Sequence, residues 1–131
     1  MAELPSMWRQ ELWHPVVVHF PIALLTLGSV AFALAMALKR KEGAAWLLPA
    51  SRALIVLGAL GAWVAVFTGV LADREVGRDL CDPLVLNAHE NNAYLVCFLF
   101  TAAILLDLLC GRFLPSERWK TWGRRLALAV L

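Results

Sequence analysis

Three histidines, His14, His19 and His89, are the side chains of this 131-residue chain best suited to chemistry. His14 and His19 stand at the start of the apolar run WHPVVVHFPIALL, and His89 precedes another apolar run. A neutral imidazole binds a metal through one ring nitrogen and can also relay protons. The pattern therefore indicates a cofactor, metal or proton-transfer site where apolar segments begin.

The elements that must position these histidines are predicted to be transmembrane helices. Hydrophobic residues make up 61% of the chain and charged residues 17%, and the mean hydropathy is positive. About 20 apolar residues cross a bilayer as a helix. The segments that meet this requirement are 16–38, 53–72 and 89–109, the last being apolar from Ala93 onward.

A fourth apolar segment, 123–131, would reach only about 14 Å as a helix. We expect it to be the start of a fourth helix or an anchor on the inner surface. The predicted fold is all-α: one integral membrane domain over residues 1–131, a helical bundle with three transmembrane helices and the start of a fourth.

Basic residues predict the orientation of this bundle. They concentrate after the first and third spans, at Lys39, Arg40, Lys41, Arg52, Arg112, Arg118, Lys120, Arg124 and Arg125. Cytoplasmic loops hold Lys and Arg in excess, so we expect these segments inside and the N-terminus outside. The tail 1–13, with Leu4, Trp8 and Leu12 four residues apart, is predicted to be an amphipathic helix on the outer surface.

This topology predicts a multi-pass protein of the bacterial inner membrane, with all three histidines at its outer face. The charge pattern of a basic inner side and an acidic outer loop excludes nucleic acid as a partner.

Helical periodicity predicts which histidine faces the bundle. One stripe of mostly small residues contains His19, Ala23, Thr26, Val30, Ala33 and Ala37. Small residues mark helix–helix contacts in membranes, so His19 is expected to point inward. His14 lies about 140° around the helix from His19, and Pro15 makes it a cap of the first turn. Pro21 should disturb the helix by leaving the Val17 carbonyl without a donor.

The other two spans have matching surfaces. In the third span, the stripe through His89 contains Asn92 or Ala93, Val96 and Phe100, with Cys97 beside it. The second span carries a strip of small residues, Gly58, Ala62, Ala65 and Gly69. Such a strip permits either close helix packing, which it favours when taken alone, or contact with a flat macrocycle.

Asp107 is an acid near the inner end of the third span. An ion pair with one of the basic residues at this interface is its expected role, although an acid in a membrane is also a functional candidate.

The first motif, HPVVVHFPIALL, resembles the HPxxVHFPIxLL opening of Domain of Unknown Function family 2231, a family of small bacterial membrane proteins. The resemblance continues in FTGVLADREV, with a glycine and an acid at Gly69 and Asp73, and in AHENNAYLVCFLF, where His89 opens the third span. It implies a four-helix membrane domain, sometimes fused to cytochrome-like modules, and no established activity. It also favours Asp73 as a residue that orients a ligand histidine.

A b-type haem is the cofactor that these residues favour, because it needs two histidines on opposite sides of a flat ring inside a helical bundle. We expect His19 and His89 to be the ligands, while Arg74 or Arg78 holds the propionates. The full set of predicted cofactor-binding residues is His19, His89, His14, Asp73, Arg74, Arg78, Gly58 and Gly69.

Two alternatives stay open. Zinc or copper would bind His14, His19 and His89 with Asp73 or Glu90. In a non-enzymatic accessory subunit of a larger membrane complex, or in a homo-oligomer, the histidines would only form hydrogen bonds. With haem, the predicted function is local electron transfer with a quinone or a periplasmic redox protein, because no histidine lies near the inner face.

Overall fold

The computed structural model describes residues 12–77, 82–113 and 124–129, and their regular structure is entirely helical. The elements are α1 (Trp13–Val17), α2 (His19–Ala37), the short 3-10 helix η2 (Glu42–Ala44), α3 (Leu47–Val76) and α4 (Pro83–Phe113). Residues 124–129 are also helical. The all-α fold class is therefore confirmed, whereas the predicted tail helix falls, up to residue 11, outside the described residues.

Three helical segments are long and apolar enough to cross a membrane: Trp13–Ala37, Glu42–Val76 and Pro83–Cys110. Each contains all or nearly all of one predicted span, so the described residues confirm three helices at the predicted places that are long and apolar enough to cross a membrane. The second and third helices begin several residues earlier than predicted. Apolar composition locates the hydrocarbon core of a span, and helices continue into the interfacial turns beyond it.

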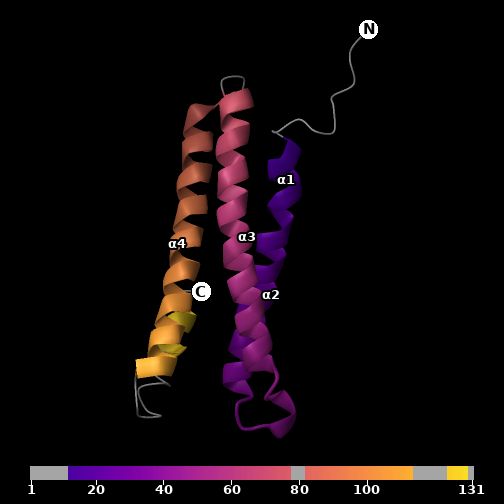
Figure 1. Ribbon diagram of the computed structural model, residues 1–131, viewed down its shortest axis with the longest axis vertical. Coiled ribbons are helices and arrows are strands. Elements are labelled where there is room, and N and C mark those ends of the chain that lie inside the picture. The colour runs from indigo at the N-terminus through magenta and orange to yellow at the C-terminus, as the bar shows by residue number, and fades with distance from the viewer. Residues whose placement is uncertain (1–11, 78–81, 114–123, 130–131) are drawn as a thin grey trace.

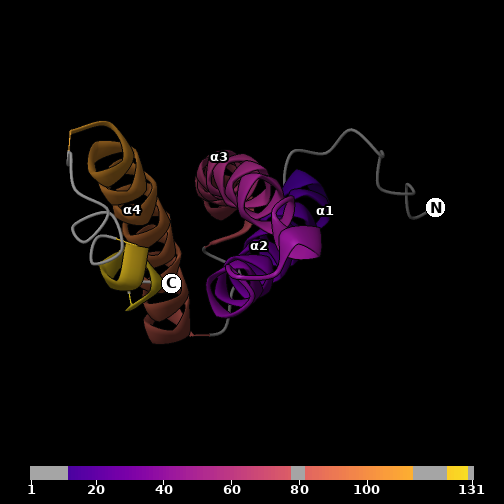
Figure 2. The same ribbon diagram turned by 90° about the horizontal axis from the view of Figure 1, so that it is seen from below.

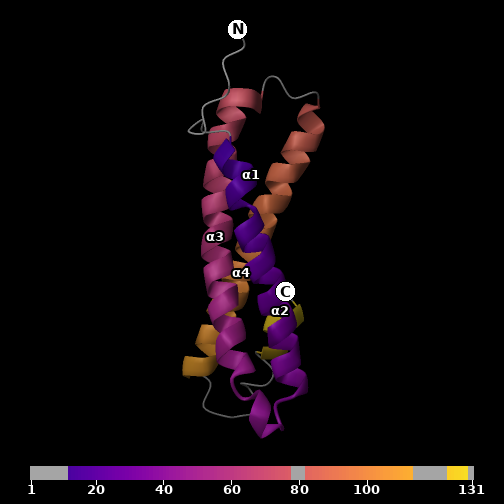
Figure 3. The ribbon, with the colours of Figure 1, turned by 90° about the vertical axis from the view of Figure 1, so that its right-hand side faces the viewer.

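The three long helices run side by side along the molecule (Figure 1). Seen along that axis, α2 and α3 form a close pair and α4 is set to one side of it (Figure 2). The "histidine end" is where α1 begins, α3 ends and α4 begins, and the "basic end" is opposite, where residues 38–46 connect α2 to α3. α4 crosses α3 at an angle, because the two helices diverge toward the histidine end in Figure 3 and toward the basic end in Figure 1.

The α2–α3 interface joins large side chains of one helix to small residues of the other. The buried residues of α2 are Pro21, Leu25, Gly28, Phe32 and Ala35, and those of α3 are Ser51, Ile55, Gly58, Ala59, Ala62 and Ala65. A Cβ added to Gly58 would lie 2.7 Å from Leu25 Cδ2, and one added to Gly28 would lie 2.8 Å from Ile55 Cγ1. Gly58 is thus a helix-packing residue, the role that the strip alone favours.

The stripe predicted to face the bundle from the first span is not the buried face of α2, although two of its residues, Thr26 and Val30, line a cavity. His19, Ala23, Thr26, Val30, Ala33 and Ala37 are all exposed on α2. The small-residue rule fails here because α3 already supplies the small residues, and the complementary face of α2 is the one with larger side chains such as Leu25 and Phe32.

The first span is interrupted one turn before Pro21. α1 ends at Val17, Val18 is a turn residue, and α2 begins at His19. Pro21 has no N–H to donate to the Val17 carbonyl, which is the residue where the helix ends. The predicted disturbance is confirmed, and it separates the backbone of His14 from that of His19.

Polar contacts fasten α4 to α3 below the histidine end. Arg52 donates from Nη2 to Asp107 Oδ1 at 2.7 Å, and its Nε lies 2.6 Å from Oδ2. Nearer the middle, Trp63 Nε1 donates to Thr101 Oγ1 at 3.2 Å, and Thr101 Oγ1 donates to the Cys97 carbonyl at 2.7 Å. The expected ion pair of Asp107 is confirmed.

Candidate functional site

His14 is held against α3 by its ring. Its Nδ1 lies 3.0 Å from the Ala65 carbonyl oxygen and 3.4 Å from Thr68 Oγ1. A carbonyl only accepts, so Nδ1 carries the proton and the Nε2 of a neutral ring keeps its lone pair. The ring rests on Gly69, where an added Cβ would lie 3.1 Å from His14 Cε1. Gly69 has no side chain, so it leaves the space that the imidazole ring of His14 occupies.

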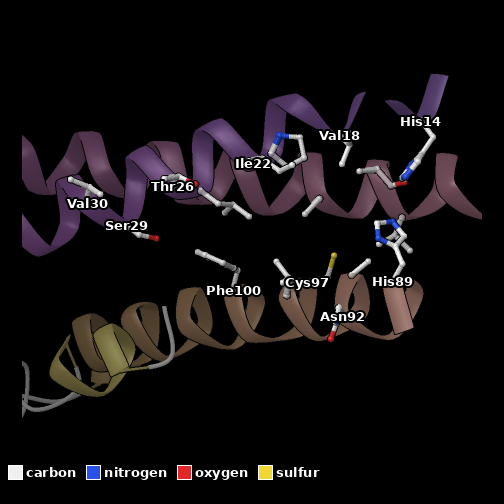
Figure 4. Close-up of a pocket in the computed structure, with 17 residues that line it drawn as sticks. His14, Val18, Ile22, Thr26, Ser29, Val30, His89, Asn92, Cys97 and Phe100 are labelled. Carbon is white, nitrogen blue, oxygen red and sulfur yellow. The ribbon is translucent and has the colours of Figure 1, made fainter. Parts of the chain in front are cut away.

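His89 approaches the same place from α4. The ring centres of His14 and His89 are 6.1 Å apart, and the ring planes are inclined by 84°. Figure 4 shows the two rings pointing toward one another at one end of a cavity. His89 is exposed on α4, and no hydrogen bond of its ring is found within the described ranges.

The assignment of His19 to the inside of the bundle and of His14 to a cap only is wrong. His14 is half-buried and His19 is exposed, and the His19 Nδ1–H donates to the Pro15 carbonyl of its own chain segment at 2.6 Å. His14 and His19 lie on different faces of the first span, as the predicted angle between them requires. The error lay in choosing the face by its small residues.

A long cavity extends from the histidine pair along the groove between α2 and α4, with α3 as its floor. Its volume is about 580 Å³, within the ~300–1,000 Å³ of small-molecule and cofactor sites. The stripe predicted for the third span lines it in full: His89, Asn92, Ala93, Val96, Cys97 and Phe100. That part of the sequence interpretation is confirmed.

A short cavity of about 290 Å³ lies on the other side of the pair, at the very end of the bundle. It shares His14, His89, Val66 and Ala93 with the long cavity and adds the carboxylates of Asp73 and Glu90. The histidine pair thus stands between one space that points into the bundle and another at its end.

The remaining predicted residues are less closely involved. Asp73 is exposed and lines the short cavity, with no described hydrogen bond to either histidine. Arg74 is exposed in the last turn of α3, and Arg78 lies outside the described residues. Gly58 lines neither cavity and is covered by Leu25.

Two residues of the site were not found from the sequence. Thr68 shares the Ala65 carbonyl with His14, since its Oγ1 donates to that oxygen at 2.9 Å. Ser29 lines the long cavity, and its buried Oγ has no hydrogen-bond partner in the described chain. In the sequence, each of these two residues is only a hydroxyl one turn from a small residue on an apolar helix. That pattern does not predict which residue of another helix lies next to it.

Bare metal and haem place different demands on these residues. A zinc site takes three or four protein ligands, and the part of the chain that the structure describes contains no group of three His, Cys, Asp or Glu side chains able to hold a metal ion. A haem iron takes only two axial side chains. The described residues thus bring two histidine rings together, His14 and His89.

No family model matches the chain, and neither a curated protein nor a solved structure matches it. The resemblance to Domain of Unknown Function family 2231 stays a prediction that depends on the quoted motifs.

Proposed function

We propose that this protein is a membrane haem protein that holds a b-type haem between His14 and His89 and transfers electrons locally with a quinone or a redox protein. The 6.1 Å separation of the two ring centres carries the proposal. Two imidazoles this close, one from α1 and one from α4, would be able to hold one haem iron between them. The proposed ligand pair is therefore His14 and His89, and it replaces the pair His19 and His89 that the sequence led us to expect.

The surroundings of the pair support this assignment. Both cavities are lined by His14 and His89, so open space flanks the two rings. The His14 Nδ1–H bond to the Ala65 carbonyl, at 3.0 Å, fixes the tautomer and the ring orientation as metal-ligating histidines usually require. When bound, the haem iron supplies one-electron oxidation and reduction. Arg74, exposed at the histidine end, is the candidate partner of a propionate.

The proposed membrane and orientation follow from charge. The basic end, with Lys39, Arg40 and Lys41, faces the cytoplasm of a bacterium, and the histidine end faces outward across the inner membrane. The haem would then lie near the outer face, where a quinone or a periplasmic redox protein can reach it. With no histidine near the basic end, the electron exchange stays on one side of the bilayer.

The absorption spectrum of protein purified in mild detergent from a haem-sufficient host tests the proposal. We expect a red protein with a six-coordinate b-type spectrum on reduction, and haem that extracts into acidified solvent because the chain has no C-x-x-C-H motif. His14→Ala and His89→Ala should each lose that spectrum. His19→Ala is the matched control and should keep it, because the His19 ring is exposed and bonds only the Pro15 carbonyl in the described structure.

Two results would contradict this assignment. Loss of haem in His19→Ala with retention in His14→Ala would restore the ligand pair expected from the sequence. A colourless wild-type protein, with all three variants folded, would favour an accessory subunit whose histidines only form hydrogen bonds.

A further inference from the structure

Ser29 is the anomaly of the long cavity. A serine inside a helix commonly bonds a backbone carbonyl one turn earlier, but the Ser29 Oγ is buried without any partner in the described ranges. Ser29 lines the long cavity (Figure 4), although protein atoms cover its Oγ in this rotamer. An unpaired hydroxyl is costly in apolar surroundings, so a ligand with a hydrogen-bond acceptor at this depth would satisfy it.

This position is too deep for a group bound at the histidine pair. Ser29 follows His14 by 15 residues, about 22 Å of helix at 1.5 Å per residue. It lies near the middle of the apolar helix α2, where lipid chains provide no acceptor. The ligand near Ser29 is therefore a second molecule, and it must itself be soluble in the membrane.

The walls around Ser29 define the shape of that molecule. Phe100 of α4 faces Ser29 across the cavity (Figure 4), and Val96 lies one turn along the same helix. Ile22 and Val96 line the cavity and yet expose 59% and 41% of their surface. The cavity consequently opens sideways, on the apolar flank of the bundle where lipid would lie.

We propose that the deep part of the long cavity, around Ser29, Val96 and Phe100, binds the ring of a membrane quinone. A rotation about the Ser29 Cα–Cβ bond brings the Oγ–H to a ring carbonyl, Phe100 packs against the ring face, and the isoprenoid tail leaves through the side opening. A quinone combines a flat apolar ring, carbonyl acceptors and solubility in the bilayer. These properties match the apolar side chains and the hydroxyl around Ser29 and the side opening of the cavity. The inference rests on the proposed function for its redox role and identifies the quinone as the electron partner, but binding itself does not require haem.

Quenching of tryptophan fluorescence measures this binding directly. Trp63 packs on a cluster that includes Leu25, Ala62 and Cys97, and these three residues also line the cavity. We would titrate decylubiquinone into the full wild-type chain in phosphatidylcholine nanodiscs, purified once from a haem-sufficient host and once from a haem-deficient host. Saturable quenching in both is expected, so that failure of the haem proposal does not affect the result.

Four variants locate the site. Ser29→Ala should weaken binding about two- to tenfold, the worth of one hydrogen bond, and Val96→Phe should abolish saturable quenching by filling the cavity. Ser51→Ala is the matched hydroxyl control, since Ser51 Oγ donates to the Leu48 carbonyl. Val85→Phe is the matched bulk control on α4, because Val85 is 65% exposed and lies outside the cavity. Both controls should bind as the wild type does.

Each of three outcomes would overturn the inference. Wild-type binding by Ser29→Ala and Val96→Phe would place the quinone elsewhere. Displacement by oleate with the same affinity in wild type and Ser29→Ala would make the cavity a groove for lipid chains. A stable dimer that excludes decylubiquinone, and that Val96→Phe dissociates, would show that a second copy covers the cavity.

Discussion

Three glycines of α3 show how single positions set the distances within this protein. An added Cβ at Gly61 would lie 3.6 Å from Pro21, an ordinary contact, whereas at Gly58 it would lie 2.7 Å from Leu25. Gly69 is intermediate, because its neighbour is the His14 ring at 3.1 Å. Glycine thus has three different surroundings on one helix: an ordinary contact at Gly61, close helix packing at Gly58 and an imidazole ring at Gly69.

Substitution of these glycines by alanine should give a graded series. Gly61→Ala should stabilise the protein by up to about 1 kcal/mol through helix propensity. Gly58→Ala should destabilise it by about 1–3 kcal/mol, since α2 must move away. Gly69→Ala should fall between them and weaken the His14–Ala65 hydrogen bond. Thermal unfolding in detergent, followed by circular dichroism, measures the order, and equal stability of Gly69→Ala and Gly61→Ala would mean that His14 does not rest on Gly69.

At the scale of elements, the helices are held by different means. α2 and α3 interlock through Leu25, Gly28, Ile55 and Gly58 along their length. α4 depends more on polar contacts with α3, from Trp63 to Thr101 and from Arg52 to Asp107. The ion pair closes a small cavity of about 100 Å³ at the basic end, which Ala127 of the C-terminal helical segment also lines. The Arg52–Asp107 pair therefore fixes the end of α4 opposite the histidines.

Removal of one member of this pair should loosen α4. Asp107→Ala leaves the Arg52 guanidinium without its carboxylate, and we expect a loss of about 1–3 kcal/mol, less than for a fully buried pair because the Arg52 side chain is 39% exposed. The double variant Arg52→Met with Asp107→Leu should recover most of that loss. Arg40→Met, an exposed residue of the basic end, is the control. Unfolding by denaturing detergent measures the wild type and these three variants, and a double variant no more stable than Asp107→Ala would contradict this account of the pair.

For the whole molecule, composition and periodicity predict the helices, but they do not always predict which faces of the helices pack against each other. The three spans and the lining stripe of α4 follow from the sequence, because apolar length and a regular turn determine them. The inward histidine does not, because small residues occur on both His19's face of α2 and the facing surface of α3, and only packing decides which helix supplies the large side chains. The Ala65 carbonyl that holds His14 likewise depends on how α1 packs against α3, which periodicity does not determine.

The orientation of the whole bundle is the remaining prediction, and cysteine labelling tests it. We expect the connection that contains Cys81 to lie outside and Cys110, near the end of α4, to lie on the cytoplasmic side, because the basic residues follow α2 and α4. A variant that keeps only Cys81 should react with a membrane-impermeant maleimide on intact spheroplasts. A variant that keeps only Cys110 should react only after lysis, and lysis with a permeant reagent controls for thiols that are buried. Reaction of Cys110 alone on intact spheroplasts would invert the bundle and place His14 and His89 at the cytoplasmic face, where a periplasmic redox partner could not reach them.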